Sequence, residues 1–181
     1  QLTPEEQKIL RALSVFAGGW TLDRAAHLLE ADEMDLVDNL GRLIDKSLVV
    51  VDREQEGGLR YRFLDTVRQY AQERHVEAGE SEDMRRRHFA VFLQLAERAY
   101  AERFAREDVW ASRLESDHDN LRVAIESVRD VDPERYAQLV GTLAWFFLAR
   151  SHFLEGRDHL TRALAGVAPE PARPARARAL W

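Results

Sequence analysis

The segment from Leu48 to Ala71 constrains the fold of this chain more than any other part of the sequence. Val49–Val51 is a β-branched run, and Leu59–Phe63 alternates apolar and basic residues with the two-residue period of a strand. Gly57 and Gly58 lie between these runs and can adopt the positive φ angles that tight turns need. The pattern therefore predicts a β-hairpin that leads directly into a helix, from about Asp65 to Ala78.

Three helical segments precede this hairpin. We expect a capping box of Thr3 and Glu6 to open the first, Thr21 to cap the second and Asp32 to open the third. The residues expected to face the core from the four helices are Ile9, Leu10, Leu13 and Phe16, then Leu22, Ala25, Ala26 and Leu29, then Met34, Leu36, Val37, Leu40, Leu43 and Ile44, and finally Val67, Tyr70 and Ala71. The order helix, helix, helix, hairpin, helix predicts a winged-helix domain over residues 1–80.

The charge of this domain is unfavourable for contact with DNA. Residues 1–80 contain 10 Lys or Arg against 16 Asp or Glu and so carry the whole net charge of −6, while residues 81–181 are balanced at 16 against 16. The third helix, which reads base edges in DNA-binding winged helices, itself sums to −2 over Glu33, Asp35, Asp38, Arg42, Asp45 and Lys46. Because Lys and Arg supply most non-specific affinity for the duplex, DNA binding by this fragment is not expected.

Residues 81–181 are expected to form a second, almost entirely helical domain. Apolar residues recur at helical spacing from Ser81 to about Phe104 and from Glu107 to Arg129, and the polar run Asp117–Asn120 predicts a break with a new helix start. Two further amphipathic helices are predicted over Pro133–Arg150 and Ser151–Val167.

The last two helices resemble a tetratricopeptide repeat. Small residues at Ala144, Gly156 and Ala163 accompany bulky ones at Leu143, Phe147 and Leu160, and Pro169 falls near the usual end of such a repeat. A further helix is predicted to begin near Arg176 and would be cut off at Trp181, so we expect the chain to be a fragment of a longer protein. Leu180 and Trp181 would then belong to an unfinished stacking surface near Leu160 and Leu164, which predicts weak self-association through this end.

Composition fits an ordinary globular protein of one or two helical domains, with 45% apolar and 32% charged residues among 181. The absence of cysteine excludes disulfides and thiolate metal sites. No apolar run approaches the roughly 20 residues that span a bilayer. We therefore expect a cytoplasmic protein without a membrane partner.

Four segments resemble, in order and spacing, landmarks of one family of bacterial regulators. The segments are Leu13–Trp20, Leu43–Val49, Tyr61–Ala71 and His118–Arg122. They are similar to the LuxR/AfsR-like signal-transduction ATPases, of the STAND and NB-ARC type. The resemblance implies an upstream P-loop ATPase module, this winged helix, a helical-repeat sensor and, in many members, a separate DNA-binding domain.

The resemblance also implies what this fragment lacks. No G-x-x-x-x-G-K-[ST] sequence occurs, so ATP or ADP would bind the parent protein and no cofactor is expected here. Plant relatives carry a Met-His-Asp motif whose histidine contacts ADP, and the matching residues are Phe63, Leu64 and Asp65. Leucine cannot make that hydrogen bond, although Asp65 can still cap its helix.

Other candidate sites have simple structural interpretations. His118 lies between Asp117 and Asp119, but three adjacent residues at a helix start do not converge on one ion, so helix capping is favoured over metal binding. His152 and His159 are interpreted as groove or surface residues, and Arg85–Arg87, preceded by Glu82 and Asp83, as a solvated or domain-facing helix. Trp20, Trp110 and Trp145 are expected in the core. The sequence shows neither a nucleophile paired with a base nor a pair of carboxylates that would indicate catalysis. No metal ligand is assigned.

Two functions are consistent with these features of the sequence. The first is a non-catalytic regulatory and interaction fragment, in which the winged helix packs on the parent's upstream nucleotide-binding domain and the repeat helices bind a protein or small-molecule effector. The alternative is a DNA-binding winged-helix transcription factor with a helical effector domain. The residues predicted to contact another domain or a partner are Asp65, Arg68, Arg85, Arg86, Arg87, Phe147, His152 and Trp181.

Overall fold

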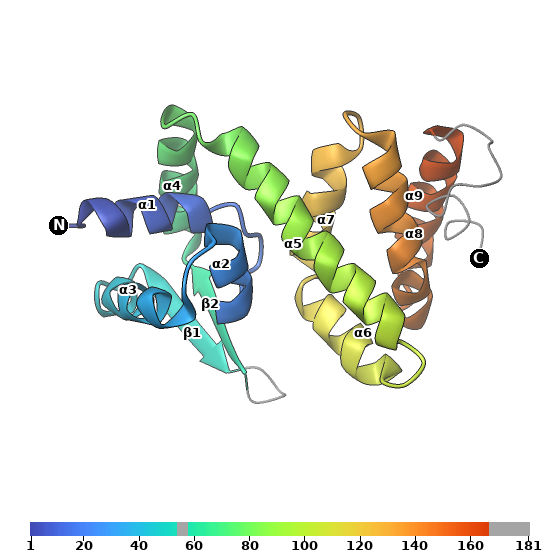
Figure 1. The fold of residues 1–181 in the computed structure, drawn as a ribbon, viewed down its shortest axis with the longest axis horizontal. Coiled ribbons are helices and arrows are strands. Elements are labelled where there is room, and N and C mark those ends of the chain that lie inside the picture. Colours follow the sequence, from blue (N-terminus) through green and yellow to red (C-terminus); the bar gives the residue numbers. More distant parts are fainter. Residues whose placement is uncertain (54–57, 167–181) are drawn as a thin grey trace. The chain divides into compact units, whose positions relative to one another are not determined.

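The computed structural model describes residues 1–53 and 58–166 and divides the chain into two compact units, the first from Gln1 to Val91 and the second beginning at Phe92. The boundary predicted from sequence, between residues 80 and 81, falls at the start of α5, whereas the units divide inside that helix. The first unit contains α1 (Pro4–Leu13), α2 (Leu22–Leu29), α3 (Glu33–Asp45), β1 (Val49–Arg53), β2 (Leu59–Phe63), α4 (Asp65–Glu77) and the first half of α5 (Ser81–Glu102) (Figure 1).

α1 begins as its sequence predicts. The Thr3 backbone N–H donates to the Glu6 carboxylate at 2.8 Å, the Glu6 N–H donates to the Thr3 hydroxyl at 3.2 Å, and Pro4 is the first helical residue. These bonds satisfy two of the backbone donors that a helix start leaves without partners. The predicted capping box is therefore confirmed.

α2 and α3 start in different ways. The Asp32 carboxylate accepts from the Met34 N–H at 2.8 Å and caps α3, as predicted. Thr21 occupies the N-cap position of α2 but makes no capping bond, and its hydroxyl oxygen accepts from the Arg24 guanidinium at 2.9 Å instead. The prediction that the Thr21 side chain caps α2 is wrong, because the Arg24 guanidinium takes the place of a backbone N–H as the donor to the Thr21 hydroxyl oxygen.

The predicted hairpin is present and is joined by a third backbone segment. β1 and β2 pair antiparallel in the register Val49 to Phe63 and Val51 to Tyr61. Trp20 and Tyr61 exchange two backbone hydrogen bonds of 2.8 Å each, so the end of the α1–α2 loop lies along β2. Gly19 permits this approach, since its φ is +103° and a Cβ there would lie 2.6 Å from the Tyr61 carbonyl oxygen.

The core of the first unit forms around aromatic residues. The Phe16 and Trp20 rings stack at 5.6 Å between centroids, and Trp20 meets Phe63 at 4.8 Å. Residues buried around them include Leu13, Leu28, Leu36, Leu40 and Leu43. Three predicted core residues point outward instead: Met34, Val37 and Tyr70 are 77%, 43% and 52% exposed.

The second unit contains the rest of α5, α6 (Glu107–Ser116), α7 (His118–Val128), α8 (Pro133–Ala149) and α9 (Phe153–Gly166). The predicted break between α6 and α7 is confirmed at Asp117, although the side chain at this N-cap makes no capping bond. Residues buried in this unit include Phe92, Trp110, Leu114, Leu121, Leu139, Leu143 and Phe146, while Trp145 is half-buried. The fold class predicted from sequence is confirmed: the described chain is mainly helical with one hairpin.

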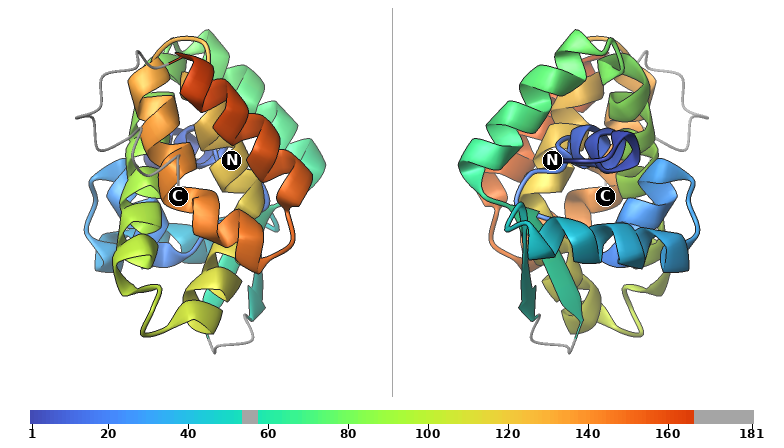
Figure 2. Two further views of the ribbon diagram at one scale, coloured as in Figure 1. Left: turned by 90° about the vertical axis from the view of Figure 1, so that its right-hand side faces the viewer. Right: turned by 90° about the vertical axis from the view of Figure 1, so that its left-hand side faces the viewer.

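α8 and α9 form a closely packed antiparallel pair (Figure 2). Gly156 lies so near α8 that a Cβ on it would be 2.7 Å from the Phe147 Cβ, and Ala163 is buried about two turns further along α9. Ser151, with φ of 61°, makes the turn between the helices. The predicted roles of Val167, Pro169 and the helix from Arg176 to Trp181 lie outside the described residues.

Across residues 1–53 and 58–166, no helix is long and apolar enough to cross a bilayer.

Candidate functional site

α3 occupies the place of the second helix in a helix-turn-helix, packed against α2 and β1. Its inner face buries Leu36, Leu40 and Leu43. Its outer face combines exposed apolar side chains, Met34 and Val37, with exposed acidic ones. The exposed acidic residues of α3 are Glu33, Asp35, Asp38 and Asp45, against the single exposed base Arg42. This face offers apolar contact and negative charge, which suit a protein surface better than a phosphate backbone.

Basic residues around the hairpin bind groups of their own unit. The Arg60 guanidinium donates to the Gly18 and Gly19 carbonyls at 3.3 and 3.2 Å. Arg62 pairs with Asp52 across the hairpin at 2.7 Å, and Lys46 donates to the Glu6 carboxylate at 2.6 Å. The hydrogen bond from Lys46 holds the pKa of Glu6 below its ordinary value. These cations are thus already neutralised or occupied within the unit.

The positions that match a Met-His-Asp motif lie where β2 meets α4. Phe63 is buried in the aromatic core, whereas Leu64 is 43% exposed at the N-cap of α4. Asp65 is exposed as the first helical residue, and α4 has no side-chain cap. The expectation that Asp65 caps its helix is wrong, because the chain enters α4 one residue earlier, at Leu64. Arg68, one turn further on, is partly buried, and its Nε makes no hydrogen bond within the described residues.

Arg85, Arg86 and Arg87 are paired with carboxylates. Arg85 lies 3.5 Å from Glu82, and Arg86 and Arg87 both bind Asp83, at 2.5 and 2.8 Å. Hydrogen bonding from Arg86 lowers the pKa of Asp83. Arg87 also reaches Glu30 at 3.0 Å and so joins α5 to the end of α2. These pairs lie within the first compact unit, although the contact between Arg87 and Glu30 crosses the boundary predicted between residues 80 and 81.

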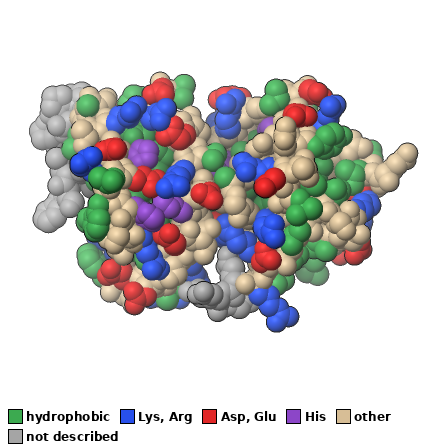
Figure 3. All heavy atoms as spheres, turned by 180° about the vertical axis from the view of Figure 1, so that it is seen from behind, with side chains coloured by type: hydrophobic (Ala, Val, Ile, Leu, Met, Phe, Trp, Pro, Cys, Tyr) green, Lys and Arg blue, Asp and Glu red, His purple; other side chains and the backbone are tan. Residues whose placement is uncertain are grey.

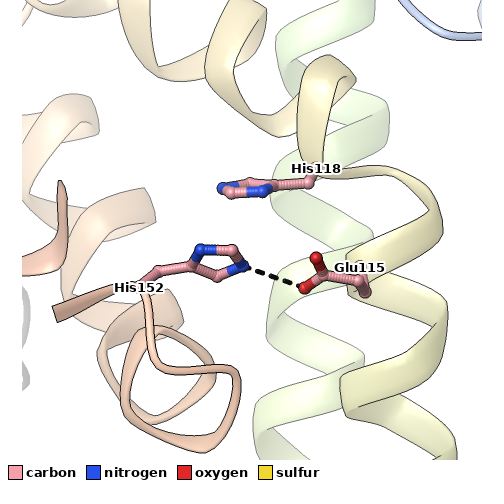
Figure 4. A group of neighbouring side chains, drawn as sticks. All are labelled: Glu115, His118 and His152. Carbon is pink, nitrogen blue, oxygen red and sulfur yellow. Dashed lines mark hydrogen bonds and ion pairs between the residues drawn. The ribbon is translucent and has the colours of Figure 1, made fainter.

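The second unit brings together a polar cluster that we define as Glu115, His118, His152 and Glu155. Glu115 lies near the end of α6, His118 opens α7, and His152 directly precedes α9 (Figure 4). Glu155 lies in the first turn of α9. His152 Nε2 is 3.0 Å from Glu115 Oε2, and the two imidazole rings face each other at 4.2 Å between centroids. His118 Nε2 is 3.2 Å from Glu155 Oε2.

Burial and an arginine set the charges of this polar cluster. Arg122 binds Glu155 through two hydrogen bonds of 2.9 and 2.8 Å, which lowers the pKa of the carboxyl group and raises that of the guanidinium. Burial lowers the pKa of His118, and the nearby Glu155 opposes this only in part. His118 is therefore neutral near pH 7 while Glu155 is ionised.

The sequence predicts a capping role for His118, but its ring is directed into the polar cluster, and α7 has no side-chain cap. The sequence places only Asp117 and Asp119 beside His118, and so does not identify Glu115 and Glu155 as its partners. The signal in the sequence is a pair of short spacings, Glu115 three residues before His118 and His152 three residues before Glu155. Phe147 is buried against Gly156 rather than presented to solvent, and Trp181 lies outside the described residues.

On the face seen in Figure 3, basic and acidic side chains are interspersed, and histidine side chains gather in one region.

Comparison with known proteins supports the first part of this fold. Residues 2–75 match the Winged helix-turn-helix domain family. A protein of Mycobacterium tuberculosis strain H37Rv whose name describes an HTH-type transcriptional regulator is 35% identical over 159 residues, which are 86% of this chain and 18% of that protein. A Mycobacterium bovis protein of the same description aligns equally. An uncharacterized protein of Mycobacterium tuberculosis is 42% identical over 85 residues, 45% of this chain and 21% of that protein.

No solved structure matches the chain significantly. The chain spans about a fifth of the length of the relatives it matches, at 18% to 21%. Fold and sequence similarity together define a winged helix-turn-helix domain from α1 into α4, continued by a helical unit.

Proposed function

We propose that this chain is a non-catalytic regulatory part of a transcriptional regulator, in which α3 binds another protein domain rather than DNA. The observation that carries the proposal is the outer face of α3, where Met34 is 77% exposed among acidic side chains. Exposed apolar residues rimmed by polar ones mark protein contacts, and carboxylates repel phosphates.

The resemblance to signal-transduction ATPases supplies the partner of this face, the nucleotide-binding domain of the parent protein. The helical unit would then receive the signal, through a protein or small molecule bound on tetratricopeptide-like helices. Close packing of Gly156 against Phe147 supports the repeat interpretation, because such repeats use small residues to bring paired helices together. An effector acts in this scheme by changing the relative stability of two arrangements of the parent.

Titration of this chain against a labelled duplex of random sequence tests the proposal. We expect no change in fluorescence anisotropy at physiological salt, because the carboxylates of α3 repel the phosphates of the duplex. Non-specific DNA binders have dissociation constants of about 10⁻⁴ to 10⁻⁶ M under these conditions, so the titration must cover this range. A variant with Asp35→Lys and Asp38→Lys tests whether the negative charge of α3 prevents DNA binding. This variant should gain salt-sensitive binding to the duplex. Salt-sensitive micromolar binding by the unaltered chain would contradict the proposal.

DNA binding by the winged helix is the second candidate. It is favoured by the family match over residues 2–75 and by relatives whose names describe HTH-type transcriptional regulators. Under this alternative Arg42 and Arg53 would supply contacts to phosphate, and substituting Arg42 with Ala would weaken binding to all sequences uniformly. The same anisotropy titration therefore separates the two candidates.

A further inference from the structure

The polar cluster places donor atoms of a kind that metal ions bind. Glu115, His118 and His152 each offer one ligand atom, and these three atoms all lie within 4.8 Å of one another. Among the described residues no other group of His, Cys, Asp and Glu meets this criterion. From this geometry we propose that Glu115, His118 and His152 form a binding site for one divalent transition-metal ion of the Zn²⁺ type.

The separations suit such an ion after small side-chain movements. Zn²⁺ is held by imidazole nitrogen and carboxylate oxygen at about 2.0–2.2 Å, so tetrahedral ligands lie roughly 3.4 Å from one another. His152 Nε2 and Glu115 Oε2 are already 3.0 Å apart. All three ligand atoms lie within 4.8 Å of one another, so they must approach by at most about 1.4 Å to reach the spacing of tetrahedral ligands.

The choice of ligands selects the class of metal. Two imidazoles and one carboxylate form a set that Zn²⁺ and its neighbours accept, leaving a fourth position for water. Mg²⁺ and Ca²⁺ prefer oxygen ligands alone and should bind poorly. Glu115 is exposed, so an ion can enter from solvent.

His118 provides an independent observation in favour of a ligand. The residue is only 9% exposed, and its Nε2 makes no hydrogen bond within the described residues, although Glu155 Oε2 lies 3.2 Å away. Buried polar atoms in folded proteins normally have partners.

Glu155 has a separate role. Both of its oxygens accept from Arg122, which leaves little negative charge for a cation. Glu155 lies 3.2 Å from His118 Nε2, the atom without a hydrogen-bond partner, so it borders the proposed site and is not a carboxylate that orients His118 through its other ring nitrogen. The ion itself would connect the α6–α7 junction to the turn before α9 and so stabilise the helical unit.

Isothermal titration of the chelator-treated chain with ZnCl₂ tests this proposal. We expect one ion per chain and a higher thermal transition with Zn²⁺ than with chelator. His152→Gln and Glu115→Gln should each weaken binding by about tenfold or more, on the scale of losses at metal sites. Both side chains are partly or fully exposed, so these variants should keep the fold, which circular dichroism checks.

His27→Gln is the matched control, since His27 is an exposed histidine of α2 in the other unit. This variant should bind Zn²⁺ as the unaltered chain does. Absence of micromolar binding, or equal affinity in the His152→Gln and control variants, would overturn the proposal. Binding of Mg²⁺ as tightly as Zn²⁺ would overturn the assignment of the metal class.

Discussion

At the scale of single residues, two glycines in helices differ in what surrounds them. A Cβ on Gly156 would meet the Phe147 Cβ at 2.7 Å and its Cγ at 2.9 Å, whereas a Cβ on Gly41 would meet nothing within 4 Å. Both residues lie inside helices, so backbone propensity alone would favour alanine at either position. The opposite expectations for the two sites follow from packing alone.

Gly156→Ala should destabilise the helical unit by about 1–3 kcal/mol, because the added methyl group forces Phe147 out of a well-packed core. Gly41→Ala should instead stabilise the chain by about 0.5–1 kcal/mol, since alanine loses less backbone entropy in a helix. Urea unfolding of both variants measures these changes. A neutral Gly156→Ala variant would show that α8 and α9 can separate without cost.

His75 should make stability depend on pH. The side chain is buried in α4, and neither ring nitrogen makes a hydrogen bond within the described residues. Burial lowers the pKa of His75, assisted by Arg11 and Arg85 and opposed by Glu80, which lies 3.7 Å away. The unfolded chain, with an ordinary imidazole pKa of about 6.5, then binds more protons below that pH, so the free energy of unfolding falls as pH decreases.

The expected result is a lower thermal midpoint at about pH 5.5 than at about pH 7.5, on either side of the ordinary imidazole pKa. His75→Gln should reduce this difference between the two midpoints. Part of the difference should remain in the variant, because burial also lowers the pKa values of His118 and His159. Identical pH dependence in the variant would show that His75 titrates normally in the folded chain. Titration of the histidine resonances by NMR gives the individual pKa values directly.

At the scale of secondary structure, the N-terminal caps of α2 and α3 should differ in how much they stabilise their helices. Asp32→Ala should cost about 0.5–2 kcal/mol, because the carboxylate that accepts from the Met34 N–H is removed. Thr21→Ala is the matched control and should cost much less, since its hydroxyl makes no capping bond. Thermal unfolding compares them, and equal losses would mean that the difference in cap geometry has no energetic consequence.

Elements could be predicted from sequence where the signal lies within a few residues. The Thr3 and Glu6 capping box, the strands around Gly58 and the break at Asp117 all depend on contacts between near neighbours. The core prediction is wrong for Met34 and Val37 because hydrophobicity alone does not give the width of a buried helix face. The polar cluster could not be predicted, because His152 and Glu115 are 37 residues apart and meet only through the packing of α6 to α9.

At the scale of the whole molecule, charge and fold lead to different expectations for the winged helix. The fold and the family match over residues 2–75 belong to a class that includes many DNA-binding domains. The chain nevertheless has a net charge of −6, all of it within residues 1–80. Since association with a duplex depends on the number of phosphates neutralised, this charge lowers the expected affinity of the winged helix for DNA.

Nucleotides should not stabilise this chain. ADP and ATP are expected to leave its thermal midpoint unchanged, because the sequence contains no G-x-x-x-x-G-K-[ST] loop and has Leu64 where the Met-His-Asp motif that it resembles has a histidine. A ligand at a hundredfold excess over its dissociation constant stabilises the native state by about 2.7 kcal/mol, a readily measured shift. Scanning fluorimetry with millimolar ADP makes this measurement.

A Leu64→His variant is the control for the missing histidine. It too should show no shift in the thermal midpoint, since one histidine cannot bind ADP without a loop that binds its phosphates. A rise in the midpoint of the unaltered chain would mean that residues other than this motif bind the nucleotide.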